Sequence, residues 1–148
     1  MRAVIQRVTR AQVKVEGVVV GDLPEGGLLV FLAVAPGDTP ETGEWMARKL
    51  AGLRIFSDAQ DRMNHSVTDL GLGALVISQF TLYGDCRKGR RPSFLGAAPP
   101  AQADELYRLF CDQLGAEGVH PVARGRFAED MKVDLLNDGP VTMIVDSP

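Results

Sequence analysis

The residues best suited to chemistry form one short run, Ser78-Gln79-Phe80-Thr81-Leu82, which follows an apolar stretch. A strand that ends here would present the Ser78 and Thr81 hydroxyls, the Gln79 amide and several unpaired backbone N–H groups at one place. Donors of this kind stabilise a developing oxyanion or bind a ribose hydroxyl. The alternative is a strand end whose polar groups are satisfied by local turns.

No motif for an activated nucleophile accompanies this run. The chain contains no GxxxxGK[ST] phosphate loop, no GxGxxG after a strand and no GxSxG elbow. Ser78 lacks the flanking glycines of an elbow, and neither His65 in a polar stretch nor His120 before Pro121 is well placed as a base. If the protein is an enzyme, we therefore expect its catalysis not to depend on an activated side-chain nucleophile.

A strongly basic segment follows the polar run. It places four positive charges within five residues: Arg87, Lys88, Arg90 and Arg91. No acidic residue occurs from Cys86 through Ala103, although the whole chain has a net charge of −3. This segregation predicts a face that binds phosphates. The neighbouring Tyr83 and Phe94 would either stack on an unpaired base or anchor the loop to the core. A solvated basic loop is the alternative. A second stretch without acidic residues holds Arg2, Arg7, Arg10 and Lys14.

The third feature is Asn137-Asp138-Gly139-Pro140, which lies between two apolar stretches. Bonds that precede proline are the ones that adopt the cis form at appreciable frequency, and tight turns are where a locked cis form is useful. An ordinary trans turn at Gly139–Pro140 is the commoner arrangement and stays open at this point.

Composition indicates an ordinary globular protein. Of 148 residues, 45% are hydrophobic and 24% are charged, which fits one domain over residues 1–148. Two cysteines and two histidines at distant positions do not predict a metal site, and no cofactor is expected. No apolar run approaches the roughly 20 residues of a membrane span, and the N-terminus lacks the features of a signal peptide, which predicts a cytoplasmic protein.

The strands that must position these residues follow from the hydrophobic pattern. We expect about seven, at residues 3–8, 11–15, 18–20, 28–34, 74–80, 131–136 and 141–145, with a further short one at 54–56. The second and third are joined by a tight turn at Glu16-Gly17, and the last two by the turn at residues 137–140. The apolar runs at 28–34 and 74–80 are typical of strands buried on both faces.

Two helices are expected. Asp38 or Thr39 caps the first, which has Pro40 in its first turn and an apolar stripe at Met46, Leu50 and Leu53. The second begins near Pro99-Pro100, ends at Gly115 and buries Leu106, Phe110 and Leu114. The order of elements favours an α/β fold: a mixed, barrel-like β-sheet with about two helices packed on one side, rather than a doubly wound parallel sheet.

Four segments, in order along essentially the whole chain, carry a resemblance to a known family: Met1 to Val8, Ser78 to Asp85, Lys88 to Phe94, and Asn137 to Thr142. They resemble the D-aminoacyl-tRNA deacylases, also called D-tyrosyl-tRNA deacylases. One departure is Ala128, which follows Phe127 where the family usually has glycine. This departure affects only the local backbone of that turn.

The resemblance implies a homodimer that hydrolyses the ester joining a D-amino acid to the 3′-terminal adenosine of tRNA, and that also removes misplaced glycine. It implies a catalytic pocket lined by Ser78, Gln79, Phe80 and Thr81, with backbone amides near Phe80 serving the ester carbonyl and the ribose. It further implies that Gly139–Pro140 is cis, enters the partner's pocket and rejects L-aminoacyl-tRNA. An aminoacyl ester is already reactive and carries a neighbouring ribose 2′-hydroxyl, so attack by water needs positioning more than a strong protein base.

Two other interpretations stay open. A non-catalytic tRNA- or RNA-binding module would use Arg87, Lys88, Arg90, Arg91 and Phe94 equally well. A small-ester hydrolase would use Thr81 as its nucleophile. Hydrolysis of D-tyrosyl-tRNA separates a deacylase from the binding module, and hydrolysis that survives Thr81→Ala excludes the nucleophile.

Overall fold

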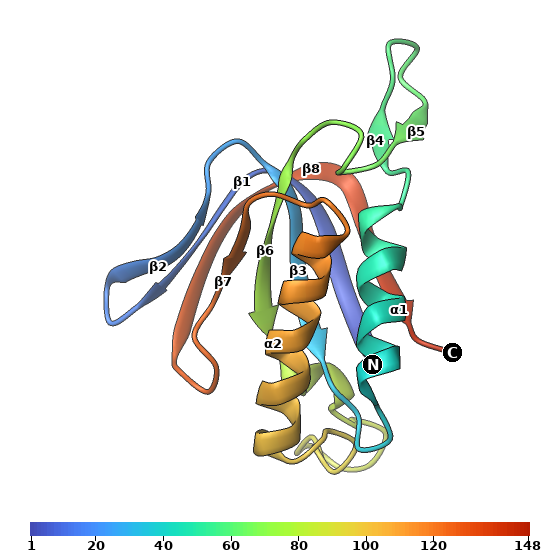
Figure 1. The fold of residues 1–148 in the computed structure, drawn as a ribbon. Coiled ribbons are helices and arrows are strands. Elements are labelled where there is room, and N and C mark those ends of the chain that lie inside the picture. The colour runs from blue at the N-terminus through green and yellow to red at the C-terminus, as the bar shows by residue number, and fades with distance from the viewer.

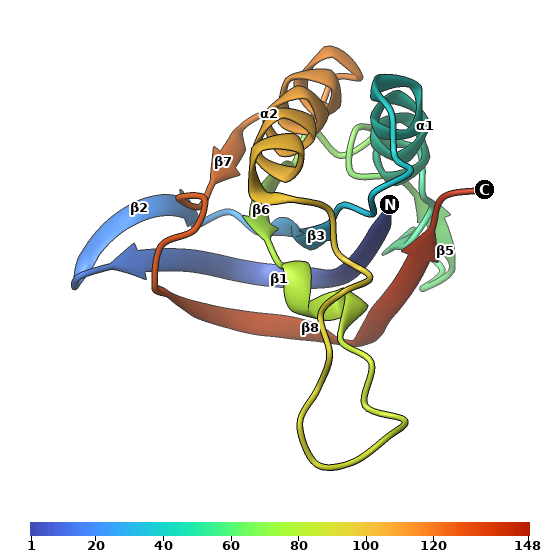
Figure 2. The same ribbon diagram turned by 90° about the horizontal axis from the view of Figure 1, so that it is seen from below.

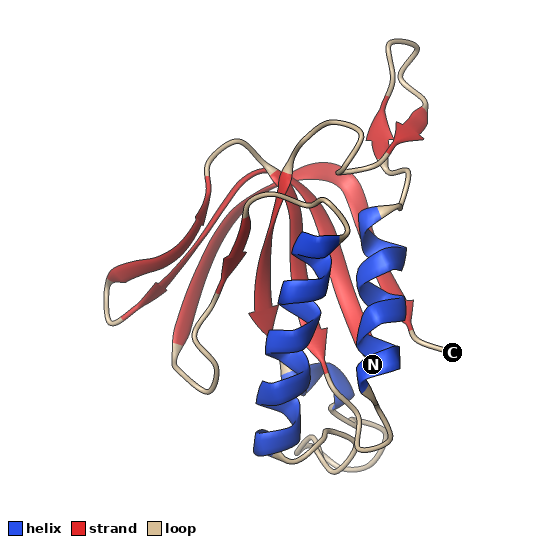
Figure 3. Ribbon diagram, viewed as in Figure 1, coloured by secondary structure: helices blue, strands red, loops and turns tan.

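The computed structural model describes residues 1–148 as a strongly curved β-sheet with two helices side by side on one face (Figures 1 and 3). The sheet contains β1 (Arg2–Val15), β2 (Val18–Leu23), β3 (Gly27–Ala33), β6 (Gly73–Ser78), β7 (Val122–Arg124) and β8 (Met131–Asp146). A separate hairpin contains β4 (Phe56–Ser57) and β5 (Met63–His65). The helices are α1 (Pro40–Ala51) and α2 (Pro100–Ala116), and the single 3-10 turn η1 spans Phe80–Tyr83.

Strand β1 organises the sheet. It pairs antiparallel with β3 through its first half, with β2 through its second half, and with β8 along almost its whole length. Strands β3, β6 and β7 then run parallel to one another. Because β1 and β8 bend together, they arch over the inner strands (Figure 1). The predicted α/β fold, with a mixed, barrel-like sheet and two helices on one side, is confirmed.

Two predicted interruptions of strands are wrong. Residues 3–8 and 11–15 belong to the single strand β1, and residues 131–136 and 141–145 belong to the single strand β8. Asn137 lies opposite Val8 and Thr142 lies opposite Gln6, so four residues of β8 face the single residue Arg7 of β1. Residues 138–141 therefore form a wide bulge at the bend of a continuous strand, because extra residues in one strand let it turn without ending. We call this segment the β8 bulge.

The inner strands are buried on both faces, as predicted. Leu28, Val30 and Leu32 of β3 pack in a core under the helices, whereas Leu29 lies in a smaller core on the opposite face of the sheet. The predicted helical stripes are also buried, apart from Leu53, which lies beyond the end of α1 and is only partly covered. The structure contains no helix with the length and apolarity that a membrane span requires.

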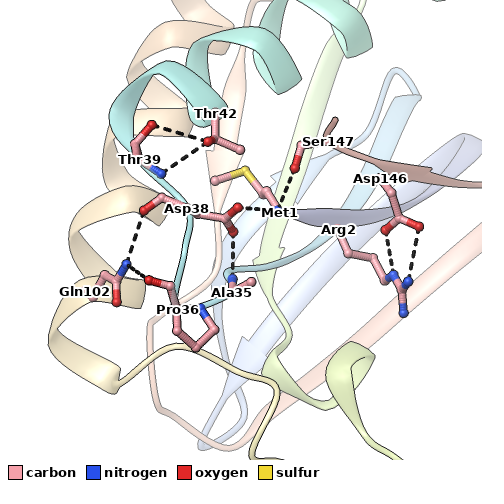
Figure 4. A network of polar contacts seen from close by, with 10 residues as sticks. All are labelled: Met1, Arg2, Ala35, Pro36, Asp38, Thr39, Thr42, Gln102, Asp146 and Ser147. Carbon is pink, nitrogen blue, oxygen red and sulfur yellow. Dashed lines mark hydrogen bonds and ion pairs between the residues drawn. The ribbon is translucent and has the colours of Figure 1, made fainter.

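A polar network fixes the segment between β3 and α1 against α2 (Figure 4). The Met1 ammonium forms an ion pair with the Asp38 carboxylate and donates to the Ser147 hydroxyl. The Gln102 side-chain amide donates to the carbonyl oxygens of Pro36 (3.1 Å) and Asp38 (3.2 Å). These contacts hold the end of β3 and the start of α2 together, and both segments line a cavity.

Candidate active site

A cavity of about 570 Å³ lies at the carboxyl ends of the parallel strands β3 and β6. Its wall is formed by the ends of these strands, the start of α2, the turn between β7 and β8, and the beginning of β8. Thirteen of the seventeen lining residues are hydrophobic, and the polar side chains among them are Ser78, Gln79 and Glu129. A cavity of this size and character suits a small organic group rather than a bare ion.

Three of the four predicted pocket residues line this cavity. Ser78 is the last residue of β6, Gln79 follows it, and Phe80 opens η1. The Gln79 N–H donates to the Leu32 carbonyl (2.8 Å), which ties the end of β6 to β3. The first N–H groups of a helical turn have no acceptor within it, so those of Phe80 and Thr81 are donors that η1 leaves unused.

Thr81 lies next to the cavity but does not line it. Its hydroxyl accepts a hydrogen bond from the Gln79 side-chain amide (2.5 Å). An amide cannot take up the proton of a hydroxyl, and Thr81 has no other side-chain partner, so nothing in this arrangement activates it as a nucleophile. Neither His65 nor His120 lines the cavity. Burial raises the pKa of the Cys111 thiol to about 12, which keeps it protonated and unreactive.

Two aromatic rings flank the cavity. Phe80 and Phe94 both line it and pack edge to face, with ring centroids 5.2 Å apart. Both rings are partly open to solvent, with 54% and 38% of each residue exposed. Gly84 permits this packing, because a Cβ there would lie 3.0 Å from the Phe94 ring and 2.9 Å from the Thr81 carbonyl oxygen. The pair offers aromatic surface at the point where the cavity meets the basic segment.

The basic segment lies on a loop that extends away from the sheet on the side opposite the helices (Figure 2). Asp85 and Ser93 close the base of this loop through two backbone hydrogen bonds of 2.8 and 3.0 Å. Arg87 forms a bidentate ion pair with Asp85, at 2.8 and 2.7 Å, and these hydrogen bonds hold the pKa of the Asp85 carboxyl below its ordinary value. Lys88, Arg90 and Arg91 are exposed and take part in no ion pair. The segment thus offers three unpaired positive charges rather than four.

The second basic stretch, near the N-terminus, is largely neutralised by the neighbouring strand. Carboxylates on β8 pair with three of its four cations: Arg2 with Asp146, Arg7 with Asp138, and Arg10 with Asp134. These acidic residues are far away in the sequence but lie on the strand that pairs with β1, with Asp146 directly opposite Arg2 and Asp134 diagonal to Arg10. These ion pairs leave little free positive charge in the stretch, so it adds little to a phosphate-binding face.

The β8 bulge contains Gly139 and Pro140, both exposed and joined by a cis peptide bond. The Arg7 guanidinium contacts the Asp138 carboxylate at 2.8 Å and also donates to the Ile55 carbonyl at 2.7 Å. Only 11% of the Arg7 side chain is exposed. These two contacts therefore place Arg7 under the bulge rather than in solvent.

Asn137 supports the same bulge from within β8. Its side-chain amide donates to the carbonyl oxygens of Arg7 (2.9 Å) and Val141 (3.1 Å), which links the start of the bulge to its end and to β1. Together with Arg7, this side chain holds Gly139 and Pro140 in one arrangement on the surface. The sequence pattern predicts Asn137 only as a turn residue and Arg7 only as a cation.

The bulge and the cavity lie at opposite ends of β3. Val8, beside the bulge, pairs with Gly27 at the start of β3, whereas the cavity begins at Leu32. Gly27 and Leu32 are five residues apart, which corresponds to about 17 Å along β3. Gly139 and Pro140 therefore cannot contact the cavity of their own chain.

Sequence reasoning missed the cavity residues of the turn between β7 and β8. Phe127, Ala128, Glu129 and Met131 line the cavity, although none belongs to the polar run. Ala128 has φ 61°, in the left-handed region that favours glycine, the residue that the resemblance leads us to expect at this position. The departure at Ala128 was the one signal in the sequence that pointed to this turn. No three His, Cys, Asp or Glu side chains gather as metal ligands do.

The chain is similar in sequence to known proteins over nearly its full length. A family model described as D-Tyr-tRNA(Tyr) deacylase matches residues 4–146. The D-aminoacyl-tRNA deacylase of Deinococcus deserti is 55% identical over 148 residues, which cover both chains completely. That of Syntrophobacter fumaroxidans is 54% identical over 147 residues, which cover 99% of this chain and 97% of the relative.

Solved structures share the fold. The c-Myc DNA Unwinding Element Binding Protein superposes with a TM-score of 0.92 and 39% identity, covering 100% of this chain and 99% of its own. A probable eukaryotic D-amino acid tRNA deacylase superposes with a TM-score of 0.83 at 20% identity, covering 97% of each chain, which shows the fold alone. Because the family model and these relatives match nearly its full length, the chain belongs to the D-Tyr-tRNA(Tyr) deacylase family.

Proposed function

We propose that this protein is a D-aminoacyl-tRNA deacylase, which hydrolyses the ester of D-aminoacyl-tRNA and releases the free D-amino acid and tRNA. The observation that carries the proposal is the convergence of Ser78, Gln79 and Phe80 on an apolar cavity beside an unpaired basic loop. A family whose relatives are named for this activity supports it. A cavity for the aminoacyl group and cations for the tRNA phosphates are the two parts that such a substrate requires.

The ester is held by backbone and side-chain donors rather than attacked by the protein. Its carbonyl oxygen accepts from the N–H groups of Phe80 and Thr81, and the Ser78 hydroxyl and Gln79 amide bind the ribose. Water adds to the carbonyl carbon, the bond to the ribose 3′-oxygen breaks, and that oxygen leaves with a proton. The adjacent 2′-hydroxyl assists this transfer, so catalysis consists mainly of orientation and oxyanion stabilisation. The terminal adenine stacks on the exposed Phe80 and Phe94 rings.

The change Thr81→Val is expected to slow deacylation by about 10-fold to 1,000-fold and to leave the fold intact, because it removes a positioning hydroxyl and not a nucleophile. Single-turnover rates on D-tyrosyl-tRNA measure the effect, and circular dichroism checks the fold. Mass spectrometry of the quenched reaction tests the alternative directly: an acyl group trapped on Thr81 would establish the small-ester-hydrolase mechanism instead.

The loop cations contact phosphates of the tRNA acceptor end. Reversing the charges of Arg90 and Arg91 together is expected to raise KM more than it lowers kcat and to flatten the salt dependence of tRNA binding. Lys49 on α1 and Arg54 just after it give the matched control, since both are exposed cations that take part in no ion pair and do not line the cavity. Their reversal should leave the salt slope unchanged. A wild-type slope in the Arg90 and Arg91 variant would identify the loop as a solvated surface.

Selection between D and L substrates is assigned to the β8 bulge of a partner subunit in a homodimer. The bulge is exposed, is held by Arg7 and Asn137, and cannot reach the cavity of its own chain. A backbone wall at Gly139–Pro140, placed against the substrate Cα, blocks the direction of an L side chain and leaves the D direction open. Glycine without a side chain passes the wall, so glycyl-tRNA is a slow substrate.

A further inference from the structure

The side chain of Arg2, at the start of β1, contacts β8 and η1 at the same time. Its Nε and Nη2 donate to the Asp146 carboxylate at 2.7 and 3.1 Å (Figure 4). Its Nη1 donates to the Leu82 carbonyl at 3.3 Å, and its guanidinium carbon lies over the Tyr83 ring, 5.4 Å from the centroid. Each nitrogen of the guanidinium therefore has a partner, and Leu82 and Tyr83 both belong to η1, the turn that carries the proposed oxyanion donors.

The turn η1 depends on contacts from outside. A 3-10 turn of four residues has little stability of its own, since its geometry is poor and its nucleation is costly. Its start is tied to β3, because the Gln79 N–H donates to the Leu32 carbonyl. The last carbonyl groups of a helical turn have no donor within it, and Arg2 supplies a donor to that of Leu82. Arg2 pairs with Ala33 in the β1–β3 ladder, so this second contact is made at the end of β3 that borders the cavity.

We propose that Arg2 is a positioning residue for deacylation. Through Leu82 and Tyr83 it fixes η1, so that the N–H groups of Phe80 and Thr81 stay directed at the ester carbonyl. Arg2 does not line the cavity and acts on the substrate only through this turn. The inference rests on the proposed function, since it names a residue that supports the same site from outside.

The exposure of the Arg2–Asp146 pair separates this role from a contribution to folding. The two side chains are 37% and 52% exposed, and ion pairs this open to water contribute little to the stability of a fold. The hydrogen bonds from Arg2 hold the pKa of the Asp146 carboxyl below its ordinary value, so the pair is charged at neutral pH. Because the carboxylate binds Nε and Nη2, it orients the planar guanidinium and leaves Nη1 for the Leu82 carbonyl.

The experiment measures kcat and KM on D-tyrosyl-tRNA together with the thermal unfolding of each variant. Arg2→Met is expected to lower kcat about tenfold and to change KM less than about twofold, because misdirected donors stabilise the oxyanion less and leave substrate binding intact. Its unfolding temperature should stay close to that of the wild type. Arg2→Lys keeps the charge but has a single nitrogen, which cannot serve Asp146 and Leu82 in the same geometry, so it should recover little of the rate.

Arg10→Met is the matched control. It breaks another exposed ion pair between β1 and β8, that of Arg10 with Asp134 at 3.1 Å, in which Arg10 makes no hydrogen bond to η1. This variant should keep the wild-type kcat. Any loss common to Arg2→Met and Arg10→Met would belong to the β1–β8 ladder as a whole and would contradict a specific role of Arg2.

Asp146→Asn tests how Arg2 is oriented. Alone, it is expected to lower kcat about threefold, because the guanidinium loses the carboxylate that directs it. Combined with Arg2→Met it should lower kcat no further, because both residues act through the same contact with η1. Effects that multiply in the double variant would show two independent roles and would overturn the arrangement.

Three results for Arg2 itself overturn the inference while the wild type is active. A kcat for Arg2→Met within about twofold of the wild type would show that η1 does not need this contact. Full recovery by Arg2→Lys, or a rise in KM in place of the fall in kcat, would make Arg2 a simple cation for the tRNA. A large drop in the unfolding temperature of Arg2→Met would make its role structural. A wild-type protein that does not hydrolyse D-tyrosyl-tRNA overturns the proposed function itself, and the inference with it.

Discussion

A heterodimer with Ser78→Phe in one subunit and Gly139→Val in the other is expected to have about half the deacylase activity of the wild-type dimer, although each variant homodimer is inactive. Phenylalanine at position 78 fills the cavity, which Ser78 lines. Valine at position 139 adds a branched side chain to the exposed bulge. If the bulge acts in the partner's cavity, the heterodimer combines one intact cavity with one intact bulge, and one of its two sites works.

The measurement uses two C-terminal affinity tags, co-expression and sequential purification, so that only heterodimers are assayed on D-tyrosyl-tRNA. Heterodimers of two differently tagged Ser78→Phe chains, and of two Gly139→Val chains, are the matched controls and should stay inactive. Circular dichroism and the mass in solution establish that each variant folds and dimerises. An inactive mixed heterodimer would show that the bulge does not complete the partner's site, and a monomeric wild type would contradict the arrangement outright.

The second large effect is the order of substrates. D-tyrosyl-tRNA is expected to be hydrolysed at least about 100-fold faster than L-tyrosyl-tRNA, with glycyl-tRNA slow but clearly detectable. The physical reason is that a backbone wall excludes a direction in space and makes no contact with the end of the side chain. D-aspartyl-tRNA should therefore fall within about tenfold of D-tyrosyl-tRNA, despite the difference in size and charge.

Initial rates at low enzyme concentration, with each substrate on its own tRNA, test this order. Heat-denatured protein controls for spontaneous hydrolysis of the ester. A rate that followed side-chain identity more closely than chirality would place selection in the cavity's side chains and not at Gly139–Pro140. Equal rates for the D and L tyrosyl esters would rule out chiral selection altogether, and no hydrolysis of any ester would favour the RNA-binding module.

Much of the architecture was predictable because it depends on local pattern. The apolar runs at residues 28–34 and 74–80 indicated strands with no solvent-facing side, and β3 and β6 have none. The helical stripes at Met46 and Leu50 and at Phe110 and Leu114 indicated which faces would be covered. The spacing of apolar side chains and the positions of chain-breaking residues reflect structure over only a few neighbouring residues. A single sequence is therefore enough to interpret them.

The strand interruptions were not predictable from the same pattern. Polar residues at 9–10 and at 137–140 resemble turns locally, but β1 and β8 continue through them because each strand has the other as a partner along its length. Ladder hydrogen bonds between residues 116 to 144 positions apart in the chain outweigh a local preference for a turn. The result is a bend and a bulge where the sequence alone indicates two ends.

The sequence by itself determined the chemical character of this protein: a polar run after a buried strand, a basic loop and a glycine–proline pair, with no activated nucleophile. Only the tertiary structure decided which of these parts meet. It placed Glu129 and Phe127 beside Ser78, neutralised Arg87 with Asp85, and put Gly139–Pro140 at the far end of β3 from the cavity. These outcomes depend on distances between residues remote in the chain, and such distances are set by strand register and by the curvature of the sheet, which no local pattern of side chains encodes.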